Sequence, residues 1–275
     1  MCRWLAYAGD PIPVDTLLFK PCNSLIHQSL SAQRAHVPTQ GDGFGLGWYG
    51  ELAKPGLYRD TMPAWNDINL RSLSEQIRSR LFFAHVRAST GTATARLNCH
   101  PFRWDRWLFM HNGRIGGWFE VRRRIEQLIS PEMYRFREGS TDSEAMFYLM
   151  LSHGLVRDPA AAMLRTFADI EEAMAAEKVD EPLRVTAALT DGERIWAVRY
   201  SSDRQSPSLY YATGGSLEVE GGDCAFCPGR GTVLIVSEPL DRHDGDWMEV
   251  PEGAIVVADG GRVTVSVLDT VTRAA

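Results

Sequence analysis

The chain has 275 residues, of which 44% are hydrophobic and 23% charged, as in an ordinary globular protein. Its net charge of −6 argues against a surface that binds nucleic acid or anionic membranes. The sequence contains neither an apolar run of about 18 residues nor a signal peptide, so we expect a cytoplasmic protein.

The first third of the chain predicts a short apolar strand over residues 2–8 and a short helix over residues 23–30. Between residues 41 and 47, glycine occupies every second position. Alternate residues of a strand share one face, so this face would be bare and open to another backbone or to a ligand. The glycine spacing does not match a phosphate-binding loop, and the Lys-Ser/Thr ending of such a loop is missing.

The middle of the chain alternates between helical and strand patterns. Residues 66–79 predict an amphipathic helix whose apolar side consists of Ile68, Leu70, Leu73 and Ile77. Residues 81–86 are continuously apolar, which is typical of a strand covered on both faces. A second apolar strand is expected over residues 107–110, ending at His111-Asn112-Gly113. Further helices are expected over residues 119–129, 143–153 and 160–177.

The last third of the chain predicts only strands, over residues 183–189, 194–200, 209–212, 232–236, 254–258 and 262–268. The order of strands, then helices, then strands indicates an α+β fold with antiparallel sheets, because wound parallel sheets alternate the two kinds of element. A chain of this size with two sheets and several helices can form a four-layer sandwich. We expect residues 1–275 to make one domain.

Five cysteines suit a reducing compartment, in which thiols stay free. Cys224 and Cys227 form the only CxxC pair, and a structural zinc would need two further ligands that no second CxxC or HxxxH pair supplies. We therefore predict a loop with two thiols, no metal site and no cofactor.

Cys2 directly follows the initiator methionine. Because cysteine is small, we expect Met1 to be removed, which leaves Cys2 with a thiol and a free α-amino group. An α-amine has a pKa of about 8 and can act as a general base near neutral pH. Nucleophile and base would then share one residue. The alternative is an ordinary small residue at the start of a buried strand.

Arg87 and Asp142 can recognise the two charges of an amino acid. Arg87 ends a buried apolar run and offers a planar fork for a carboxylate, although it could equally pair with a carboxylate of the protein. Asp142 lies in the stretch Thr141-x-x-Glu144, a capping box at the start of an apolar helix. Its carboxylate suits the helix dipole and can also bind a substrate ammonium.

Asn112-Gly113 is a strong hairpin signal, because both residues tolerate positive φ. The Asn112 side-chain amide and the Gly113 backbone N–H can also act as two donors to one oxyanion, as acyl transfer requires. A tight turn could be what aims these donors, so the two interpretations are compatible. Combined with Cys2, Arg87 and Asp142, they describe a site for the γ-amide of an amino acid.

This arrangement resembles the class II glutamine amidotransferases. The matching stretches are residues 1–2, 87–91, 111–113 and 140–144. Further stretches resemble the amidotransferase-like subunit of the fungal DUG glutathione-degrading complex: residues 41–45, 61–66, 83–90, 98–102, 237–240 and 245–247. A more distant similarity, centred on Met1-Cys2-Arg3, is to the ergothioneine-pathway γ-glutamyl hydrolase.

The resemblance implies an Ntn-hydrolase αββα sandwich and cleavage of a γ-glutamyl amide through a thioester at Cys2. It implies that Asn112 and Gly113 form the oxyanion hole, that Arg87 and Asp142 bind the glutamyl carboxylate and ammonium, and that the Thr90 loop contacts the same group. One departure concerns this loop, because many family members have His-Gly after the threonine, whereas Gly91 follows Thr90 directly here.

Three functions remain open from the sequence. The first is a γ-glutamyl amidohydrolase that acts on glutamine, glutathione or a related compound, with water as the acceptor. The second is a glutaminase subunit that supplies ammonia to a separate synthase. The third is a binding subunit without catalysis. The expected partners are a small γ-glutamyl substrate and either a peptidase or a synthase subunit, but neither nucleic acid nor a membrane.

Overall fold

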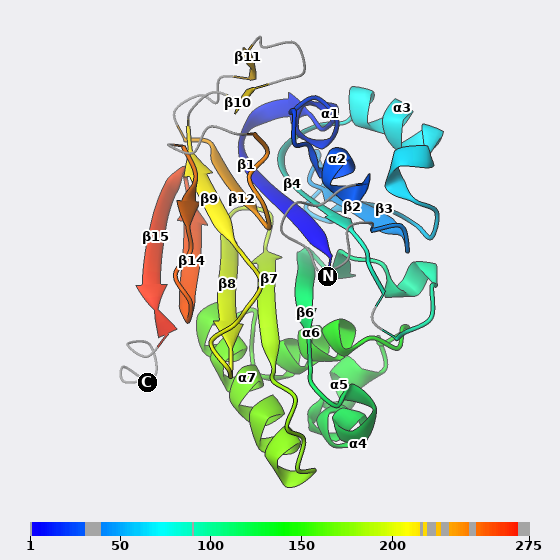
Figure 1. Cartoon of the computed structure of the whole chain (residues 1–275), viewed down its shortest axis with the longest axis vertical. Coiled ribbons are helices and arrows are strands. Elements are labelled where there is room, and N and C mark those ends of the chain that lie inside the picture. Colours follow the sequence, from blue (N-terminus) through cyan, green and yellow to red (C-terminus); the bar gives the residue numbers. More distant parts are fainter. Residues whose placement is uncertain are drawn as a thin grey trace.

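Two antiparallel β-sheets lie face to face, and helices cover the outer face of each (Figure 1). The computed structural model describes residues 2–30, 40–89, 91–214, 217–218, 224–226, 231–241 and 246–268. This α+β arrangement has the four layers that the sequence predicts. Cys224 belongs to a described strand whose side chains are not described, and Cys227 lies outside the described residues.

The first sheet has seven strands in the order β13-β9-β12-β1-β4-β2-β3. Its central strand, β1, is flanked by antiparallel neighbours from both ends of the chain: Leu5 is opposite Ala84 of β4 and Val236 of β12. The nucleophile candidate therefore precedes an interior strand. The bounds are β1 Arg3–Pro13, β2 Phe44–Trp48, β3 Gly56–Asp60, β4 Arg78–Val86, β9 Tyr210–Thr213, β12 Val233–Val236 and β13 Met248–Glu249.

The second sheet has six strands in the order β15-β14-β8-β7-β6-β5. The bounds are β5 Phe102–Trp104, β6 Trp107–Arg114, β7 Arg184–Thr190, β8 Ile195–Ser201, β14 Ala254–Asp259 and β15 Arg262–Val267. Strand β6 pairs with β7 without interruption as far as Arg114, which is opposite Arg184. The hairpin interpretation of Asn112-Gly113 is therefore wrong, since both residues lie inside a paired strand. A separate two-stranded ribbon joins β10 Leu217–Glu218 and β11 Cys224–Phe226.

Two groups of helices cover the sheets. The N-terminal group packs on the seven-stranded sheet, and the central group packs on the six-stranded sheet. The first group comprises α1 Asp15–Leu18, α2 Leu25–Leu30 and α3 Ile68–Gln76, and the second α4 Trp118–Leu128, α5 Pro131–Tyr134, α6 Asp142–Ser152 and α7 Pro159–Ala176. Short 3₁₀ turns lie at η1 Ala64–Asn66 and η2 Arg96–Asn98.

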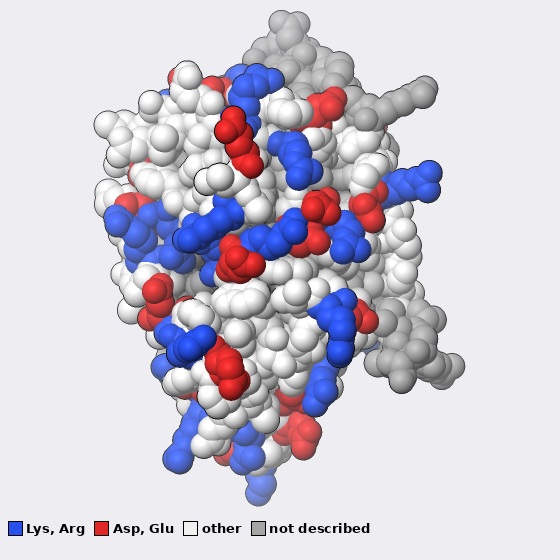
Figure 2. All heavy atoms as spheres, turned by 180° about the vertical axis from the view of Figure 1, so that it is seen from behind, with Lys and Arg blue, Asp and Glu red and all other residues white. Residues whose placement is uncertain are grey.

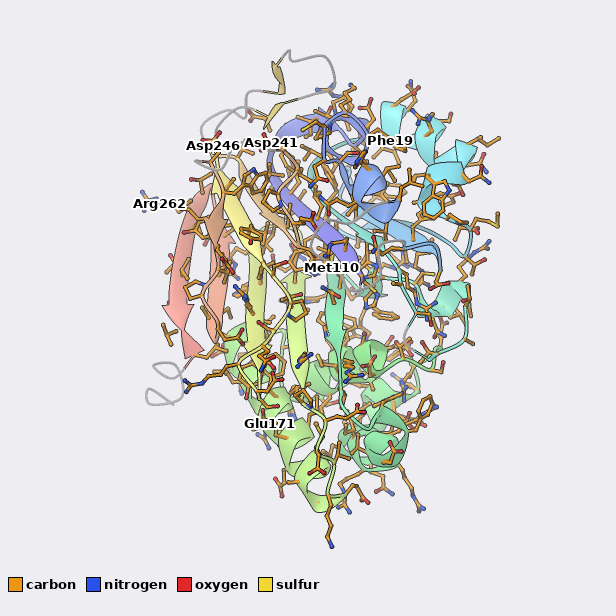
Figure 3. All side chains as sticks on the ribbon, in the orientation of Figure 1. Phe19, Met110, Glu171, Asp241, Asp246 and Arg262 are labelled. Carbon is orange, nitrogen blue, oxygen red and sulfur yellow. The ribbon has the colours of Figure 1, made fainter. Side chains whose placement is uncertain are left out.

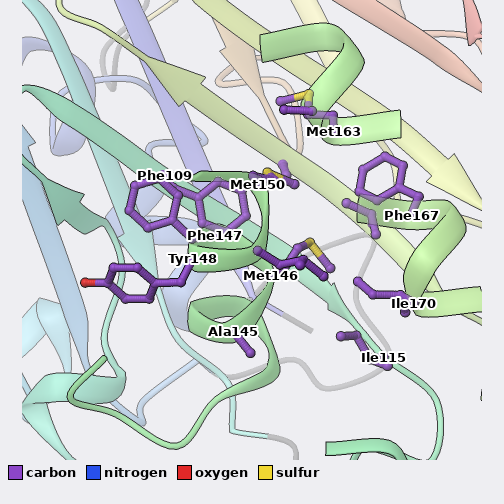
Figure 4. Close-up of a cluster of buried hydrophobic side chains, with 14 of the residues drawn as sticks. Phe109, Ile115, Ala145, Met146, Phe147, Tyr148, Met150, Met163, Phe167 and Ile170 are labelled. Atoms are coloured by element: carbon purple, nitrogen blue, oxygen red, sulfur yellow. The ribbon is translucent and has the colours of Figure 1, made fainter. Parts of the chain in front are cut away.

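Three apolar cores separate the four layers. The middle core lies between the sheets and includes Trp4 and Ala6 of β1 with Met110 of β6, and Met110 is close to the centre of the molecule in Figure 3. In the core beneath α6 and α7, the rings of Phe109 and Phe147 stack at 5.3 Å (Figure 4). Alternate residues of β1 and β6 thus contribute to different cores, as the two-residue period of strands requires.

Helix α3 differs from its predicted apolar side. Leu70 is 1% exposed, but Ile68 is 82% and Leu73 39% exposed. The helix buries Leu70 and Ser74, which are one turn apart on the same face. This nine-residue helix therefore contacts the rest of the protein through a narrow stripe on that face. The prediction of a helix is confirmed, whereas the assignment of its buried face is wrong.

The glycine-rich stretch lets another backbone approach closely. Of its four alternating glycines, only Gly45 and Gly47 lie within β2. A Cβ atom at Gly45 would sit 2.0 Å from the carbonyl oxygen of His100, and one at Gly47 would sit 2.8 Å from Pro101. The bare face therefore holds the segment that carries His100 against the sheet.

The surface carries both signs of charge. Lys and Arg side chains are interspersed with Asp and Glu across the face seen in Figure 2. Among the described residues, no helix is long and apolar enough to cross a membrane.

Candidate active site

The start of β1 meets the end of β6 in the layer between the two sheets. Trp4 of β1 faces this layer, and its indole N–H donates to the carbonyl oxygen of Thr186 at 3.3 Å. Thr186 is the partner of Asn112 in the β6–β7 ladder. By strand alternation, Cys2 is on the Trp4 side of β1, and Asn112 is on the Met110 side of β6. The nucleophile candidate and the oxyanion candidate thus face one interior space.

A single small cavity brings together four of the predicted site residues: Cys2, Arg87, Gly113 and Asp142. The remaining lining residues are Ala88, Ser89, Thr92, His100, His111, Thr141 and Ser143. Asn112 precedes Gly113 but is not part of the lining. Thr90, the sixth predicted residue, lies outside the described residues.

The Cys2 thiol is held by the chain that follows Arg87. Its Sγ lies 3.4 Å from the Ala88 backbone N–H nitrogen and 3.5 Å from the Ala88 carbonyl oxygen. Burial raises the pKa of the Cys2 thiol, while the Ala88 N–H and the Arg87 charge oppose this and the Asp142 charge adds to it. The thiol is therefore protonated at neutral pH and needs a base to become a nucleophile.

Arg87 is 3% exposed, and its guanidinium binds only neutral oxygens among the described residues. Its Nη1 donates to the Asp42 carbonyl at 3.2 Å, and Nη2 donates to Thr92 Oγ1 at 2.8 Å and to Ser89 Oγ at 3.2 Å. A buried cation without a carboxylate partner is strongly attracted to an anion. The geometry therefore favours capture of a ligand carboxylate over a structural ion pair.

Asp142 is fixed at the first turn of α6. Its Oδ2 accepts the Ile115 N–H at 2.9 Å, and its Oδ1 accepts the Ser143 N–H at 2.8 Å. Oδ1 also accepts a hydrogen bond from the Ser143 hydroxyl at 3.3 Å, so the second lone pair of Oδ2 is the one left for a ligand. Two backbone bonds and the helix N-terminus thus hold an anion at the edge of the cavity.

The predicted capping box at the start of α6 is half formed. Thr141 Oγ1 accepts the Glu144 N–H at 3.1 Å, as expected. The Glu144 carboxylate accepts the N–H groups of Glu138 and Gly139, at 3.0 and 2.8 Å. Glu144 therefore binds the loop that precedes the helix and not the N-cap residue.

Gly113 is required by the local backbone, whereas Asn112 has a feature that a purely structural role leaves unexplained. Gly113 has φ +151°, and a Cβ atom there would lie 1.9 Å from the Arg184 carbonyl oxygen, so only glycine fits. Both polar atoms of the Asn112 side chain are buried without a hydrogen-bond partner among the described residues. A buried amide without partners destabilises the fold, so its presence points to a ligand.

Two buried histidines, His100 and His111, line the cavity, and a third, His85, lies beside His100; the sequence alone indicates a role for none of them. Burial lowers the pKa of His85 to about 3 and that of His100 well below its ordinary value. It also lowers the pKa of His111, against the Asp142 charge. His111 Nδ1 lies 2.8 Å from Ser143 Oγ, and the His85 and His100 rings are 4.2 Å apart. The histidines are therefore neutral, and the signal that could have found them is a histidine within or beside an apolar strand.

Among the described residues, no group of three or more histidine, cysteine or acidic side chains is arranged to hold a metal ion. The cavity thus contains a thiol, a buried cation and an anion, and Asn112 beside it carries an amide without a partner among the described residues.

Comparison with known proteins agrees with this inventory. The profile of the family "Glutamine amidotransferases class-II" matches residues 16–275. The chain belongs to the class II glutamine amidotransferases. This class II amidotransferase is 36% identical to the "Probable glutamine amidotransferase DUG3" of Saccharomyces cerevisiae, over 93% of this chain and 81% of the yeast protein. It is 26% identical to the "Gamma-glutamyl-hercynylcysteine sulfoxide hydrolase" of Mycolicibacterium smegmatis, over 98% of this chain and 100% of that protein.

Solved structures confirm the Ntn-hydrolase fold of this class II amidotransferase. A glutamine aminotransferase class-II domain protein from Silicibacter pomeroyi matches with a TM-score of 0.73 and 35% identity, over 96% of this chain and 98% of that chain. The glutamine phosphoribosylpyrophosphate amidotransferase of B. subtilis matches with a TM-score of 0.58 at 11% identity, over 98% of this chain and 49% of that chain. This second similarity concerns the fold alone.

Proposed function

We propose that the protein, as one domain over residues 1–275, is a γ-glutamyl amidohydrolase that uses Cys2 as its nucleophile. The observation that carries the proposal is the single cavity lined by Cys2, Arg87, Gly113 and Asp142. An arginine that has no carboxylate partner within the described ranges and an anchored aspartate match the two charges of a free amino acid end. The thiol and the oxyanion donors then meet the side-chain carbonyl.

In the proposed acylation step, the free α-amine of Cys2 takes the thiol proton, and Sγ attacks the γ-carbonyl carbon. The carbonyl oxygen becomes an oxyanion that accepts hydrogen bonds from the Asn112 side-chain amide and the Gly113 N–H. The C–N bond breaks as the α-ammonium of Cys2 returns the proton to the leaving amine. A γ-glutamyl thioester of Cys2 remains.

In the proposed deacylation step, the α-amine of Cys2 takes a proton from water while the water oxygen attacks the thioester carbon. The same oxyanion donors stabilise the second tetrahedral intermediate. Its collapse breaks the C–S bond, the thiolate takes back the proton, and glutamate leaves. Removal of Met1 is required, because the amine of Cys2 is otherwise part of a peptide bond.

We propose that a local shift at Thr92 admits the substrate. The cavity beside Cys2 has a volume of about 30 Å³, which is too small for a glutamyl group. A neighbouring cavity of about 270 Å³ shares Thr92 and Asp142 with it. Displacement of the Thr92 side chain would join the two spaces and release the Arg87 Nη2 donor that Thr92 occupies.

The substrate class that we propose is a compound with an unmodified γ-glutamyl end, such as glutamine or glutathione. The yeast relative is named for glutamine and the mycobacterial one for a γ-glutamyl compound, so the γ-glutamyl group is what they share. We propose water as the acceptor and a cytoplasmic location. A glutaminase that supplies ammonia to a separate synthase uses the same site chemistry and is the competing proposal.

Glutamate release from glutamine and from glutathione, measured side by side with the purified protein, tests the proposal. Mass spectrometry of the same sample establishes whether Met1 is gone. Release from glutathione supports hydrolysis of γ-glutamyl peptides, and release from glutamine alone favours ammonia supply. A protein that lacks Met1 and releases glutamate from neither substrate contradicts the proposal.

Replacing the nucleophile gives the first prediction. Cys2→Ser should lower glutamate release by at least ~10²-fold, because a hydroxyl is a much poorer nucleophile than a thiol at neutral pH. Circular dichroism should be unchanged, since the hydrogen bonds of Sγ to described residues are two weak ones with Ala88. Unchanged turnover, with removal of Met1 verified by mass, would exclude Cys2 from the mechanism.

A further inference from the structure

Arg3 and Glu238 form a buried ion pair directly beside the nucleophile. The two side chains are 1% and 2% exposed, and Arg3 Nε lies 3.1 Å from Glu238 Oε2. Arg3 Nη1 also donates to the Cys2 carbonyl oxygen at 3.0 Å. One guanidinium therefore binds a carboxylate from the far end of the chain and the backbone of the candidate nucleophile.

The segment that carries Glu238 is itself firmly held. The Trp4 N–H donates to Ser237 Oγ at 3.1 Å, and the Ser237 N–H donates to the Trp4 carbonyl oxygen at 3.0 Å. The Gln28 side-chain amide donates to the Glu238 carbonyl oxygen at 3.3 Å. The backbone of Glu238 is thus held in place, and its carboxylate orients the Arg3 side chain.

A buried ion pair is a poor source of stability, because removing two charges from water offsets most of their attraction. Apolar side chains of similar size would stabilise the same place as well or better. The presence of this pair next to Cys2 therefore calls for a reason other than stability.

We propose that the Arg3–Glu238 ion pair positions Cys2 for attack on the substrate, an inference that rests on the proposed role of Cys2. After removal of Met1, Cys2 is a chain terminus, and termini are poorly ordered unless they are tied down. The bond from Arg3 to the Cys2 carbonyl fixes the orientation of this last peptide unit. Arg3 and Glu238 act through Cys2 and touch no reacting atom, so they are positioning residues.

The geometry requires arginine at position 3. Its planar fork presents two donors in different directions, one to Glu238 and one to Cys2, whereas lysine is a single compact charge. A misplacement of the nucleophile by about 1 Å can lower the rate by about 10²-fold. Loss of the pair should therefore lower kcat and leave substrate binding by Arg87 and Asp142 intact.

The decisive variant removes both charges together, as Arg3→Met with Glu238→Leu, so that no unpaired charge is left in the interior. We expect a melting temperature at or above that of the wild type, and a fall in kcat of about 10- to 10²-fold. The Michaelis constant for glutamine and the dissociation constant of the product glutamate should not change. Mass spectrometry and titration with a thiol reagent verify that Met1 is absent and that Cys2 is intact.

A control lies on β8, where Arg199 also binds a carboxylate and a backbone carbonyl oxygen, but at a more exposed site: Glu249 is 55% exposed, and Arg199 Nε lies 3.7 Å from a second carboxylate, that of Glu252. Arg199 Nη1 lies 2.6 Å from Glu249 Oε1 and 2.7 Å from the Val250 carbonyl oxygen. The double variant Arg199→Met with Glu249→Gln removes this pair, which lies two strands from β6 in the six-stranded sheet and, within the described residues, makes no hydrogen bond with Cys2 or Arg3. Its kcat should equal that of the wild type.

Arg3→Lys is the second test, because it keeps the charge and loses the fork. We expect a folded protein with a several-fold lower kcat and an unchanged Michaelis constant. A stable Arg3/Glu238 double variant with wild-type kcat would overturn the proposal. If that double variant fails to fold, a folded Arg3→Lys variant with wild-type kcat would overturn it equally.

The two proposals fail in different ways. A wild-type protein that lacks Met1 and releases no glutamate from glutamine or glutathione contradicts the proposed function. An active wild type whose kcat is insensitive to these substitutions contradicts only the positioning role of the ion pair.

Discussion

Asn112 carries a side-chain amide that is fully buried and makes no hydrogen bond within the described part of the chain. The neighbouring Gly113 has a backbone that no other residue could adopt beside Arg184. Together they place two donors, one side-chain and one backbone, next to a cavity that contains a thiol. An amide N–H without a partner can donate a hydrogen bond to a substrate oxygen on which negative charge develops.

Asn112→Ala should therefore lower kcat by about 10²–10³-fold, the usual effect of removing one oxyanion donor. Thermal stability should change little, because the substitution breaks no hydrogen bond that the described residues make. Steady-state kinetics with glutamine and a melting curve measure the two effects. A variant that melts many degrees lower and keeps its kcat would assign Asn112 a structural role.

The residue types that define the chemistry could be predicted from the sequence, but their surroundings could not. A cysteine at position 2 and an arginine at the end of an apolar run each allowed a structural interpretation, and only their combination with Asn112, Gly113 and Asp142 predicted a site. The neutral state of His85 and His100 depends on burial by residues far away in the chain. Likewise, the contact between Arg3 and Glu238 joins residues 235 positions apart, which no local pattern indicates.

Close packing of one backbone against another restricts the residue type at some strand positions, and Gly45 of β2 is the clearest example. Gly45→Ala would place a Cβ atom 2.0 Å from the His100 carbonyl oxygen, so either β2 or the segment after Asn98 would have to move. We expect a loss of roughly 1–3 kcal/mol in the free energy of unfolding, together with reduced activity because His100 lines the cavity. Urea unfolding measures the former.

Gly50→Ala serves as the matched control, because a Cβ atom there meets nothing within 4 Å. Its free energy of unfolding should lie within about 0.5 kcal/mol of the wild type, as for ordinary surface changes. Equal effects of the two substitutions would show that the approach of His100 to β2 does not restrict residue 45.

Element types were predictable where periodicity was long, and less so where a local signal competed with pairing. The helices over residues 119–129, 143–153 and 160–177 are confirmed within one residue at each end, because their patterns run for three turns or more. Asn112-Gly113 carries a local turn signal, but seven consecutive pairs hold β6 against β7, and this ladder outweighs the signal. The burial of α3 depends on which of its turns touches the layer below, which its own periodicity does not specify.

Buried neutral histidines make the stability of the whole molecule depend on pH. Unfolded histidine has a pKa of about 6.5, whereas burial lowers that of His85 to about 3 in the folded protein. Between these values the unfolded chain binds protons that the folded protein does not, so a falling pH favours unfolding. The contribution of neutral His85 to the free energy of unfolding is therefore largest above about pH 6.5 and is lost progressively as the pH falls toward 3.

At pH 5.5 the contribution of His85 alone should lower the free energy of unfolding by ~1.4 kcal/mol relative to its value well above pH 6.5. Urea unfolding at pH 7.5, 6.5 and 5.5 measures this loss, and His100 adds to it in the same direction. His85→Gln cannot titrate, so its stability should fall less steeply over the same interval. Parallel curves for the variant and the wild type would contradict the buried, neutral state of His85.

The pairing of β1 with β12 also has a consequence for the time course of protein synthesis. Leu5 pairs with Val236, so the strand that begins beside Cys2 lacks one neighbour until more than 230 residues have been translated. At roughly 5–20 residues per second, the ribosome takes at least about ten seconds to reach that point. During this interval the amino terminus is exposed to the aminopeptidase while Glu238 does not yet exist. A nascent chain therefore has time to lose Met1 before Arg3 meets Glu238, and under the proposed positioning role a chain truncated before Glu238 would lack an oriented nucleophile.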